Sequence, residues 1–145
     1  MSGHIPAALV RDVIARASDL CEYCQLPQET QEVTFHVDHI LPRVQDGPTV
    51  LENLALACVT CSLKKSARTH AIDPKTGEEI QLFNPRSDEW LDHFAFSDNG
   101  SIAPQTPIGR ATADLLAMNR PAIVLIRREL AILGRFPPSR GSAAS

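Results

Sequence analysis

Residues 21–65 read CEYCQLPQETQEVTFHVDHILPRVQDGPTVLENLALACVTCSLKK. The stretch carries two matching pairs, Cys21-x2-Cys24 and Cys58-x2-Cys61. Zinc binds four thiolates in a tetrahedral shell, and proteins often supply them as local pairs of this kind. Free buried cysteines would not produce two equal pairs, and a redox site needs only one, inside a βαβ pattern that is missing here. We therefore predict a Zn²⁺ ion with a structural role, because four protein ligands leave it no open position.

Hydrophobic periodicity predicts the elements around these pairs. Between Pro6 and Leu20 the apolar residues recur at three-to-four spacing, which indicates an amphipathic helix that leads into the first pair. Val33–Leu41 is rich in β-branched and aromatic residues and is followed by Pro42, as in a strand. Asn53–Lys65 predicts a short second strand that continues into a helix. The order is helix, strand, strand, helix.

The second half of the chain predicts three further elements. Asp73-Pro74-Lys75-Thr76-Gly77 is a turn sequence, and a strand at Ile80–Phe83 follows it. Thr112–Met118 and Pro121–Leu133 indicate helices, the second with proline in its first turn and Gly134 just past its end. The fold class we expect is α+β.

Length and composition favour one domain. The chain has 145 residues, of which 43% are hydrophobic. We predict a single domain over residues 1–136, with its core at about 18–68 and added strand and helices at 73–134, and a disordered tail at 137–145. No stretch approaches the roughly 18 apolar residues of a membrane span, and the first residues lack a signal peptide's features. We expect a cytoplasmic protein without a membrane partner.

Charge is unevenly distributed along the chain. The formal net charge of −3 does not favour a nucleic-acid partner. However, residues 58–72 carry Lys64, Lys65 and Arg68 without any acid, whereas residues 73–98 are acidic. Local positive faces matter more for phosphate affinity than the total does. The negative net charge therefore weakens the case for a nucleic-acid partner, but it does not exclude one.

The residues between the cysteine pairs suggest hydrolytic chemistry. Phosphodiester hydrolysis requires a base that activates water and a cation that neutralises developing charge. Asp38 suits a hard cation, and His39 suits a base that titrates near neutrality. Neighbours on a regular strand point to opposite faces. The two side chains therefore serve one site only if the strand bends or ends there, which Pro42 favours.

These motifs resemble those of the HNH endonucleases, which combine a ββα-metal core with a four-cysteine zinc site. The resemblance rests on C-E-Y-C, H-V-D-H-I-L-P and E-N-L-A-L-A-C-V-T-C-S-L-K-K, in order and spacing, over about residues 18–68. The later segments L-F-N-P-R, W-x2-H-F, G-R-A-T and L-A-M-N resemble the downstream signature of one bacterial subgroup. With them included, the resemblance extends over about residues 5–134.

The resemblance implies a role for several residues. It makes His39 the general base, Asp38 a ligand of a catalytic Mg²⁺ or Mn²⁺ ion, and Asn53 the residue that braces the loop and orients His39. The family usually carries Asn or His at the second ligand position, where this chain has Ser62. A hydroxyl is a weaker ligand, so the departure puts metal affinity in question. Ser66 likewise replaces a glycine that is common in the family.

Other residues have more than one interpretation. We predict DNA contacts at four cations: Arg43, Lys64, Lys65 and Arg68. For the last three, phosphate contact and a solvated face are equally good interpretations. Arg43 follows the active strand and suits bidentate phosphate contact. His36 either reaches DNA or metal or, as we favour, is a surface histidine satisfied by a partner. For His93, packing against the core is at least as good an interpretation as catalysis.

Three functions compete at this point. The first, which the intact Asp38, His39 and Asn53 favour, is a metal-dependent endonuclease that cuts DNA. The alternative is a zinc-stabilised nucleic-acid-binding protein that has lost catalysis through Ser62. The third is a zinc-organised protein-interaction module that uses the acidic segment 73–98. The sequence contains no recognisable DNA-reading motif, so we expect weak sequence specificity.

Overall fold

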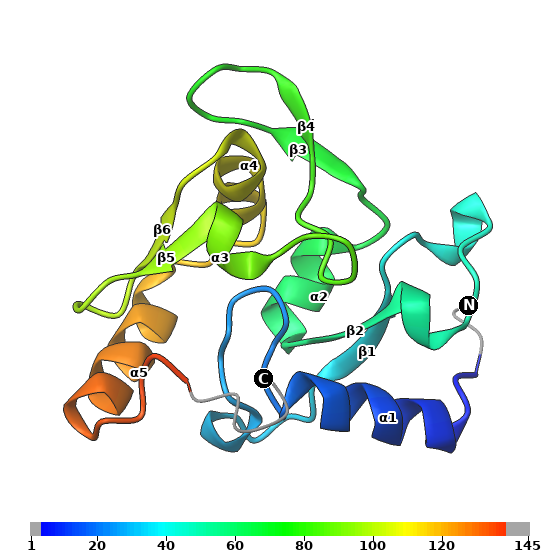
Figure 1. The fold of residues 1–145 in the computed structure, drawn as a ribbon, viewed down its shortest axis with the longest axis horizontal. Coiled ribbons are helices and arrows are strands. Elements are labelled where there is room, and N and C mark those ends of the chain that lie inside the picture. The colour runs from blue at the N-terminus through cyan, green and yellow to red at the C-terminus, as the bar shows by residue number, and fades with distance from the viewer. Residues whose placement is uncertain (1–3, 139–145) are drawn as a thin grey trace.

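The structure of the chain, a computed structural model, describes residues 4–138. It is α+β, as predicted, and its described part contains three separate two-stranded antiparallel sheets with helices around them (Figure 1). From residue 139 on, the disordered tail predicted at 137–145 lies outside the described residues. Among residues 4–138 there is no helix with the length and hydrophobicity that a bilayer crossing requires.

The first half forms a helix followed by a ββα unit. Its elements are α1 (Ala7–Ala17), β1 (His36–His39), β2 (Leu54–Ala57) and α2 (Val59–Lys65). β1 pairs with β2 in a register that sets His39 opposite Leu54, and α1 packs against β2. The order agrees with the prediction. The strand predicted over Val33–Leu41 is shorter, because β2 offers only four pairing residues.

The second half adds two hairpins and three helices. They are β3 (His70–Ile72), β4 (Glu79–Gln81), α3 (Trp90–His93), β5 (Phe94–Phe96), β6 (Ile102–Pro104), α4 (Pro107–Leu115) and α5 (Pro121–Ile132). α4 packs against both hairpins. It starts five residues before the predicted Thr112, because the Thr106 side chain caps it by accepting a hydrogen bond from the Gly109 amide. The strand predicted at Ile80–Phe83 ends at Gln81, and Leu82 and Phe83 turn into the core.

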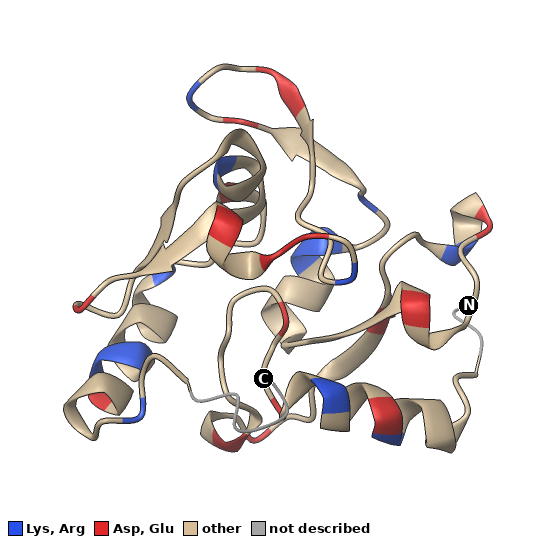
Figure 2. Ribbon diagram, in the orientation of Figure 1, with Lys and Arg blue, Asp and Glu red and all other residues tan. Residues whose placement is uncertain are grey.

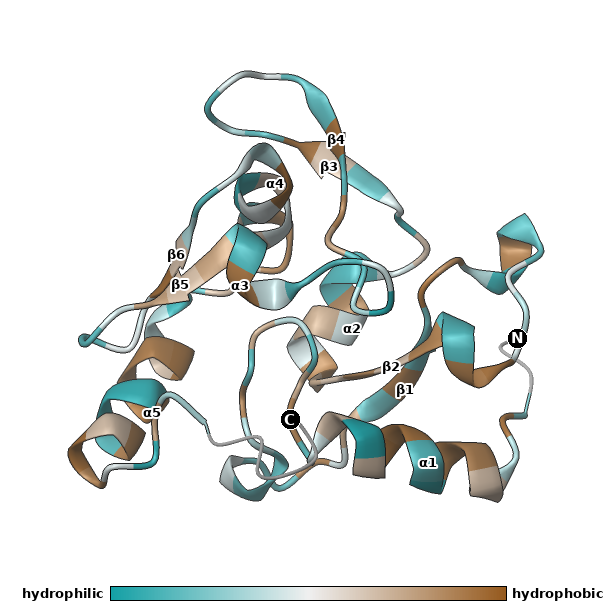
Figure 3. Cartoon of the chain, in the orientation of Figure 1, coloured by the Kyte–Doolittle hydropathy of each residue, from teal (hydrophilic) through white to brown (hydrophobic). Residues whose placement is uncertain are grey.

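One continuous cluster of buried side chains joins the two halves. It extends from Val13 in α1 through β2 to Leu116, Leu130 and Phe136. The ribbon of β2 is coloured toward the hydrophobic end of the scale, whereas the loop between β3 and β4 is largely hydrophilic (Figure 3). Arg86 in the second half pairs with Glu22 beside the first cysteine pair. The ββα unit is therefore stabilised both by the shared core and by the ion pair between Arg86 and Glu22.

Candidate active site and metal centre

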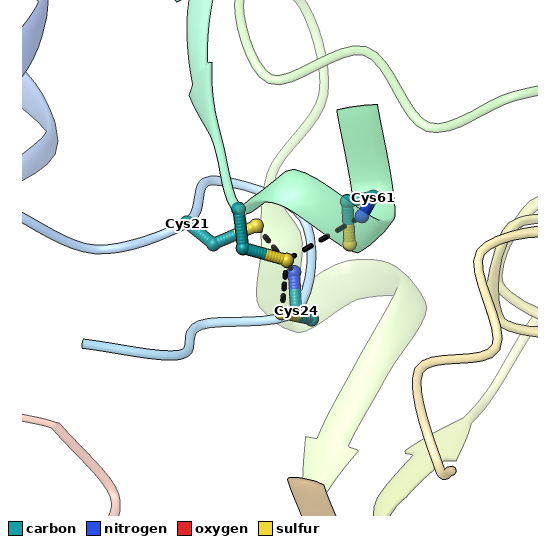
Figure 4. A group of neighbouring side chains, drawn as sticks. Cys21, Cys24 and Cys61 are labelled. Atoms are coloured by element: carbon teal, nitrogen blue, oxygen red, sulfur yellow. Dashed lines mark hydrogen bonds between the residues drawn. The ribbon is translucent and has the colours of Figure 1, made fainter. Parts of the chain in front are cut away.

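The four cysteines gather into one buried cluster. The sulfurs of Cys21, Cys24, Cys58 and Cys61 all lie within 4.8 Å of one another, and none forms a disulfide (Figure 4). The Sγ atoms of Cys24 and Cys58 are 3.7 Å apart. Zinc–sulfur bonds of roughly 2.3 Å in a tetrahedron place the sulfurs about 3.8 Å apart. The cluster therefore fits a single tetrahedral metal ion such as zinc.

Local backbone structure orients the thiols. The Cys24 amide donates to the Cys21 sulfur, and the Cys61 amide donates to the Cys58 sulfur, each at 3.4 Å. Cys58 is also the N-cap of α2. Side-chain hydrogen bonds from Cys21 and the other two cysteines lower the pKa of Cys58. Burial raises the pKa of Cys21, and hydrogen bonds from the other cysteines raise the pKa of Cys61. Metal binding requires deprotonated thiols, so it would be accompanied by release of protons from the cluster.

A groove beside β1 collects the polar residues of the central motif. It has a volume of about 690 Å³ and lies between β1, the turn after it and α2. Its lining includes His36, Asp38, His39, Arg43 and Ser62. All four residues of β1 border the groove, so the alternation of the strand does not keep Asp38 and His39 apart. Asp38 and His39 therefore both border the groove.

Asn53 ties together the loop between β1 and β2. Its side chain is buried. Its Nδ2 donates to the carbonyls of Pro48 (2.9 Å) and Leu41 (3.0 Å), and its Oδ1 accepts from the Leu41 amide at 2.9 Å. Its own carbonyl accepts from the Ile40 amide at 2.8 Å. These bonds fix the chain immediately after His39.

His39 has a partner that the sequence did not suggest. Its Nε2 lies 2.8 Å from the hydroxyl oxygen of Thr49, a residue on the loop that Asn53 holds. Burial lowers the pKa of His39, and Arg43 lowers it further, while Asp38 opposes the shift. The imidazole is therefore neutral near pH 7. No sequence motif marks Thr49, because the contact depends on how the loop folds back.

Ser62 lies against His36. The Ser62 hydroxyl oxygen is 2.8 Å from His36 Nδ1, and both residues border the groove. The sequence interpretation favoured His36 as a surface histidine with a partner. His36 does have a partner, but it is only half-exposed and belongs to the groove. The two residues join β1 to α2 on the wall that also carries Asp38.

The prediction that Lys65 contacts DNA needs correction. Its side chain is 3% exposed, and its ammonium lies 3.2 Å from the Ile40 carbonyl and 3.4 Å from the His39 carbonyl. Burial lowers the pKa of Lys65, and Asp38 opposes the shift. Successive helix residues are turned by about 100° from each other, so Lys64 faces solvent while Lys65 faces inward. Lys65 supports the end of β1.

The other predicted DNA-binding cations are exposed. Arg43 follows β1, Lys64 lies near the end of α2, and Arg68 comes just after that helix. Figure 2 shows blue ribbon at the end of α2. Arg43 alone among them borders the groove. His93, in contrast, is half-buried and packs against the core: its Nδ1 is 2.7 Å from the Thr106 hydroxyl, and its ring packs edge-on against Phe83.

Comparison with known proteins agrees with this geometry. Residues 21–68 match the family model described as HNH endonuclease, while searches of curated proteins and of solved structures each return no match. The matched span contains both cysteine pairs, β1, β2 and α2. The subgroup motifs after residue 68 lie outside it, so that part of the resemblance stays a prediction. Residues 21–68 of this chain form a domain of the HNH endonuclease family.

Proposed function

We propose that this protein is a metal-dependent endonuclease that hydrolyses DNA phosphodiester bonds, with zinc in the cysteine cluster and Mg²⁺ or Mn²⁺ in the groove. One observation carries the proposal: within the HNH domain, a carboxylate, a neutral histidine and an exposed arginine border a single groove. These are Asp38, His39 and Arg43. Hydrolysis of a phosphodiester needs a metal ligand, a base and a contact to phosphate.

His39 acts as the general base. The oxygen of a water molecule attacks phosphorus, the bond from phosphorus to one sugar oxygen breaks, and a proton of the water passes to His39. If the Thr49 hydroxyl accepts from Nε2–H, the lone pair lies on Nδ1, which then receives this proton. Thr49 would thus select the tautomer, as partners of catalytic histidines commonly do.

Asp38 supplies the charged oxygen ligand of the catalytic ion. Mg²⁺ and Mn²⁺ prefer oxygen ligands, and Mg²⁺ is commonly held by one or two carboxylates together with water and substrate phosphate. When bound, the ion polarises the phosphate and stabilises charge on the leaving oxygen. Ser62 and its partner His36 stand on the same wall, where the family places its second ligand.

DNA is held by exposed cations around the groove. Arg43 is the best placed for the reacting phosphate, because it borders the groove and suits bidentate contact. Lys64 and Arg68 contact phosphates further along the strand. Because the net charge is −3, we expect few further cation–phosphate contacts in the interface. We therefore expect affinity that falls steeply with salt.

A nucleic-acid-binding protein without cleavage is the second candidate. One observation favours it: the Ser62 hydroxyl is already engaged with His36, which weakens it further as a ligand. The third hypothesis, a protein-interaction module, loses support because the acidic segment is partly used within the fold. The Asp73 carboxylate is buried and accepts two hydrogen bonds from Arg110, at 2.9 and 2.8 Å.

A nicking assay on supercoiled plasmid separates these functions. Wild type with Mg²⁺ or Mn²⁺ should convert plasmid to the nicked or linear form, and His39→Ala should not. His70→Ala is the matched control, since His70 is exposed on β3 and does not border the groove. If wild type shifts DNA in a salt-dependent manner without nicking it, the second candidate is correct. If wild type neither nicks the plasmid nor shifts DNA, both candidate functions are rejected.

A further inference from the structure

We propose that Arg127 and Arg120, at α5, are the counter-charges of the zinc-thiolate cluster and link the C-terminal part of the chain to its metal. The proposal rests on zinc occupying the four-cysteine cluster and is independent of whether the protein cuts DNA. Both residues lie outside the span that matches the HNH family. Their role is to stabilise the bound metal rather than to ligate it.

Arg127 is a buried cation without an acidic partner. Its side chain is 0% exposed. Its Nη2 donates to the Cys24 carbonyl at 3.0 Å and its Nη1 to the Gly100 carbonyl at 3.2 Å. Within residues 4–138 no carboxylate forms a salt bridge with it, and its Nε has no hydrogen-bond partner. Its observed partners are therefore neutral carbonyls.

Such an environment is unfavourable for a lone charge. An isolated charge is stable in a protein interior only when an opposite charge or a metal site compensates it, and arginine does not escape by losing its proton. The guanidinium of Arg127 lies against the cysteine cluster through the Cys24 backbone. When a metal ion is bound there, the thiolates would supply the opposing negative charge.

Arg120 approaches the cluster from the start of the same helix. It is the N-cap residue of α5, and its Nη2 lies 3.9 Å from the Cys58 sulfur. Residues seven apart on a helix share a face, so Arg120 and Arg127 both point toward the cluster. A zinc ion with four thiolates carries two excess negative charges. The two guanidinium groups balance them.

The turn between β5 and β6 completes this contact. Gly100 has a positive φ of 90°, and a Cβ atom there would lie 2.5 Å from the Val124 carbonyl oxygen of α5. Only glycine allows the turn to approach the helix closely enough for its carbonyl to reach Arg127. The cluster, the turn and α5 are therefore packed as one unit.

Zinc affinity measured by competition with a chromogenic chelator tests the proposal. Arg127→Met should raise the zinc dissociation constant by about 10- to 100-fold, the usual effect of removing an outer partner of a metal site. Arg127→Lys retains the charge and should restore much of the affinity. Arg120→Gln should weaken binding less, because its contact is longer. The matched control is Arg128→Met, which removes an exposed arginine from the same helix without a contact to a cysteine.

A second measurement distinguishes weaker metal binding from a general loss of structure. With Co²⁺ in place of zinc, the thiolate-to-cobalt absorption band should keep its shape in Arg120→Gln while the Co²⁺ dissociation constant rises. If Arg127→Met does not fold, Arg120→Gln decides the matter. A zinc dissociation constant equal to that of wild type in Arg120→Gln, and in Arg127→Met where that variant folds, would overturn the proposal. So would a freshly purified, reduced protein that binds no zinc.

Discussion

Cys61 and Ser62 are neighbours on α2, yet they belong to two different kinds of site. Cys61 is buried with three other cysteines, and protein groups enclose that cluster on all sides. Ser62 is only half-buried and borders a groove that is open to solvent. A fully ligated metal has no position left for a substrate, whereas an open site does. We therefore propose that the cysteine cluster provides stability and that the groove provides the chemistry.

Removal of a cysteine should have the largest effect. Cys58→Ala should release zinc and unfold much of the chain, because structural zinc contributes on the order of 10 kcal/mol of binding free energy, comparable with a whole domain's stability. Elemental analysis together with thermal unfolding followed by circular dichroism would measure this. A Cys58→Ala protein that remains folded without metal would show that the cluster is not what holds the fold together.

Removal of the base should affect only the groove. His39→Ala should lower the nicking rate by about 10²- to 10⁴-fold, as is typical of a lost general base. Its zinc content and midpoint of thermal unfolding should stay near those of wild type. An active His39→Ala protein would mean that another group takes the proton.

The pH dependence of nicking follows from the same residue. The base works only when the imidazole is neutral, and burial lowers the pKa of His39 below the ordinary value of 6.5. The rate should therefore be constant near pH 7 and fall only below about pH 6. Rates measured at constant ionic strength would test this, with zinc content checked at each pH. A rate that falls already between pH 8 and pH 7 would contradict the assigned environment of His39.

Thr49 should show a smaller effect. Thr49→Val keeps the shape of the side chain but removes the hydroxyl that lies 2.8 Å from His39 Nε2. We expect a loss of roughly 10- to 100-fold in nicking rate, in the range for partners that orient a functional histidine. Thr49→Ser keeps the hydroxyl and should retain most of the activity. If Thr49→Val and Thr49→Ser both nick DNA at the wild-type rate, Thr49 has no role in the site.

Ser62 should show the smallest effect. Ser62→Asn and Ser62→His should lower the Mn²⁺ concentration needed for half-maximal nicking, and Ser62→Ala should raise it only modestly. The structure adds that Ser62→Ala also frees His36 from its partner. His36→Ala in parallel would therefore separate the two residues. Four superimposable Mn²⁺ titrations for wild type and the Ser62 variants would show that this position is no ligand.

The cysteine cluster was predictable from spacing alone, because two C-x-x-C pairs require little knowledge of the rest of the fold. The contacts of the groove were not predictable, because each joins residues that are far apart in the sequence. Thr49, on the loop after β1, contacts His39, and Ser62 of α2 contacts His36 of β1. Hydropathy was also misleading on α2, where Leu63 is 68% exposed and Lys65 only 3%. Tertiary contacts of the ββα unit overrode the ordinary preference of each side chain.

The short elements of the second half escaped prediction for a similar reason. β3, β5, β6 and α3 have only three or four residues each, too few for a periodic pattern to be recognised. Long-range contacts hold them in place. The Trp90 indole of α3, for example, donates to the Tyr23 carbonyl beside the first cysteine pair at 2.8 Å.

Metal removal and restoration test the division between the two sites most directly. Protein treated with a mild chelator should keep about one zinc per chain and lose all nicking activity, and Mg²⁺ or Mn²⁺ alone should restore that activity. His39→Ala, treated identically, should keep zinc and stay inactive. Nicking that persists without added Mg²⁺ or Mn²⁺ while zinc is retained, or that returns equally in His39→Ala, would contradict the account.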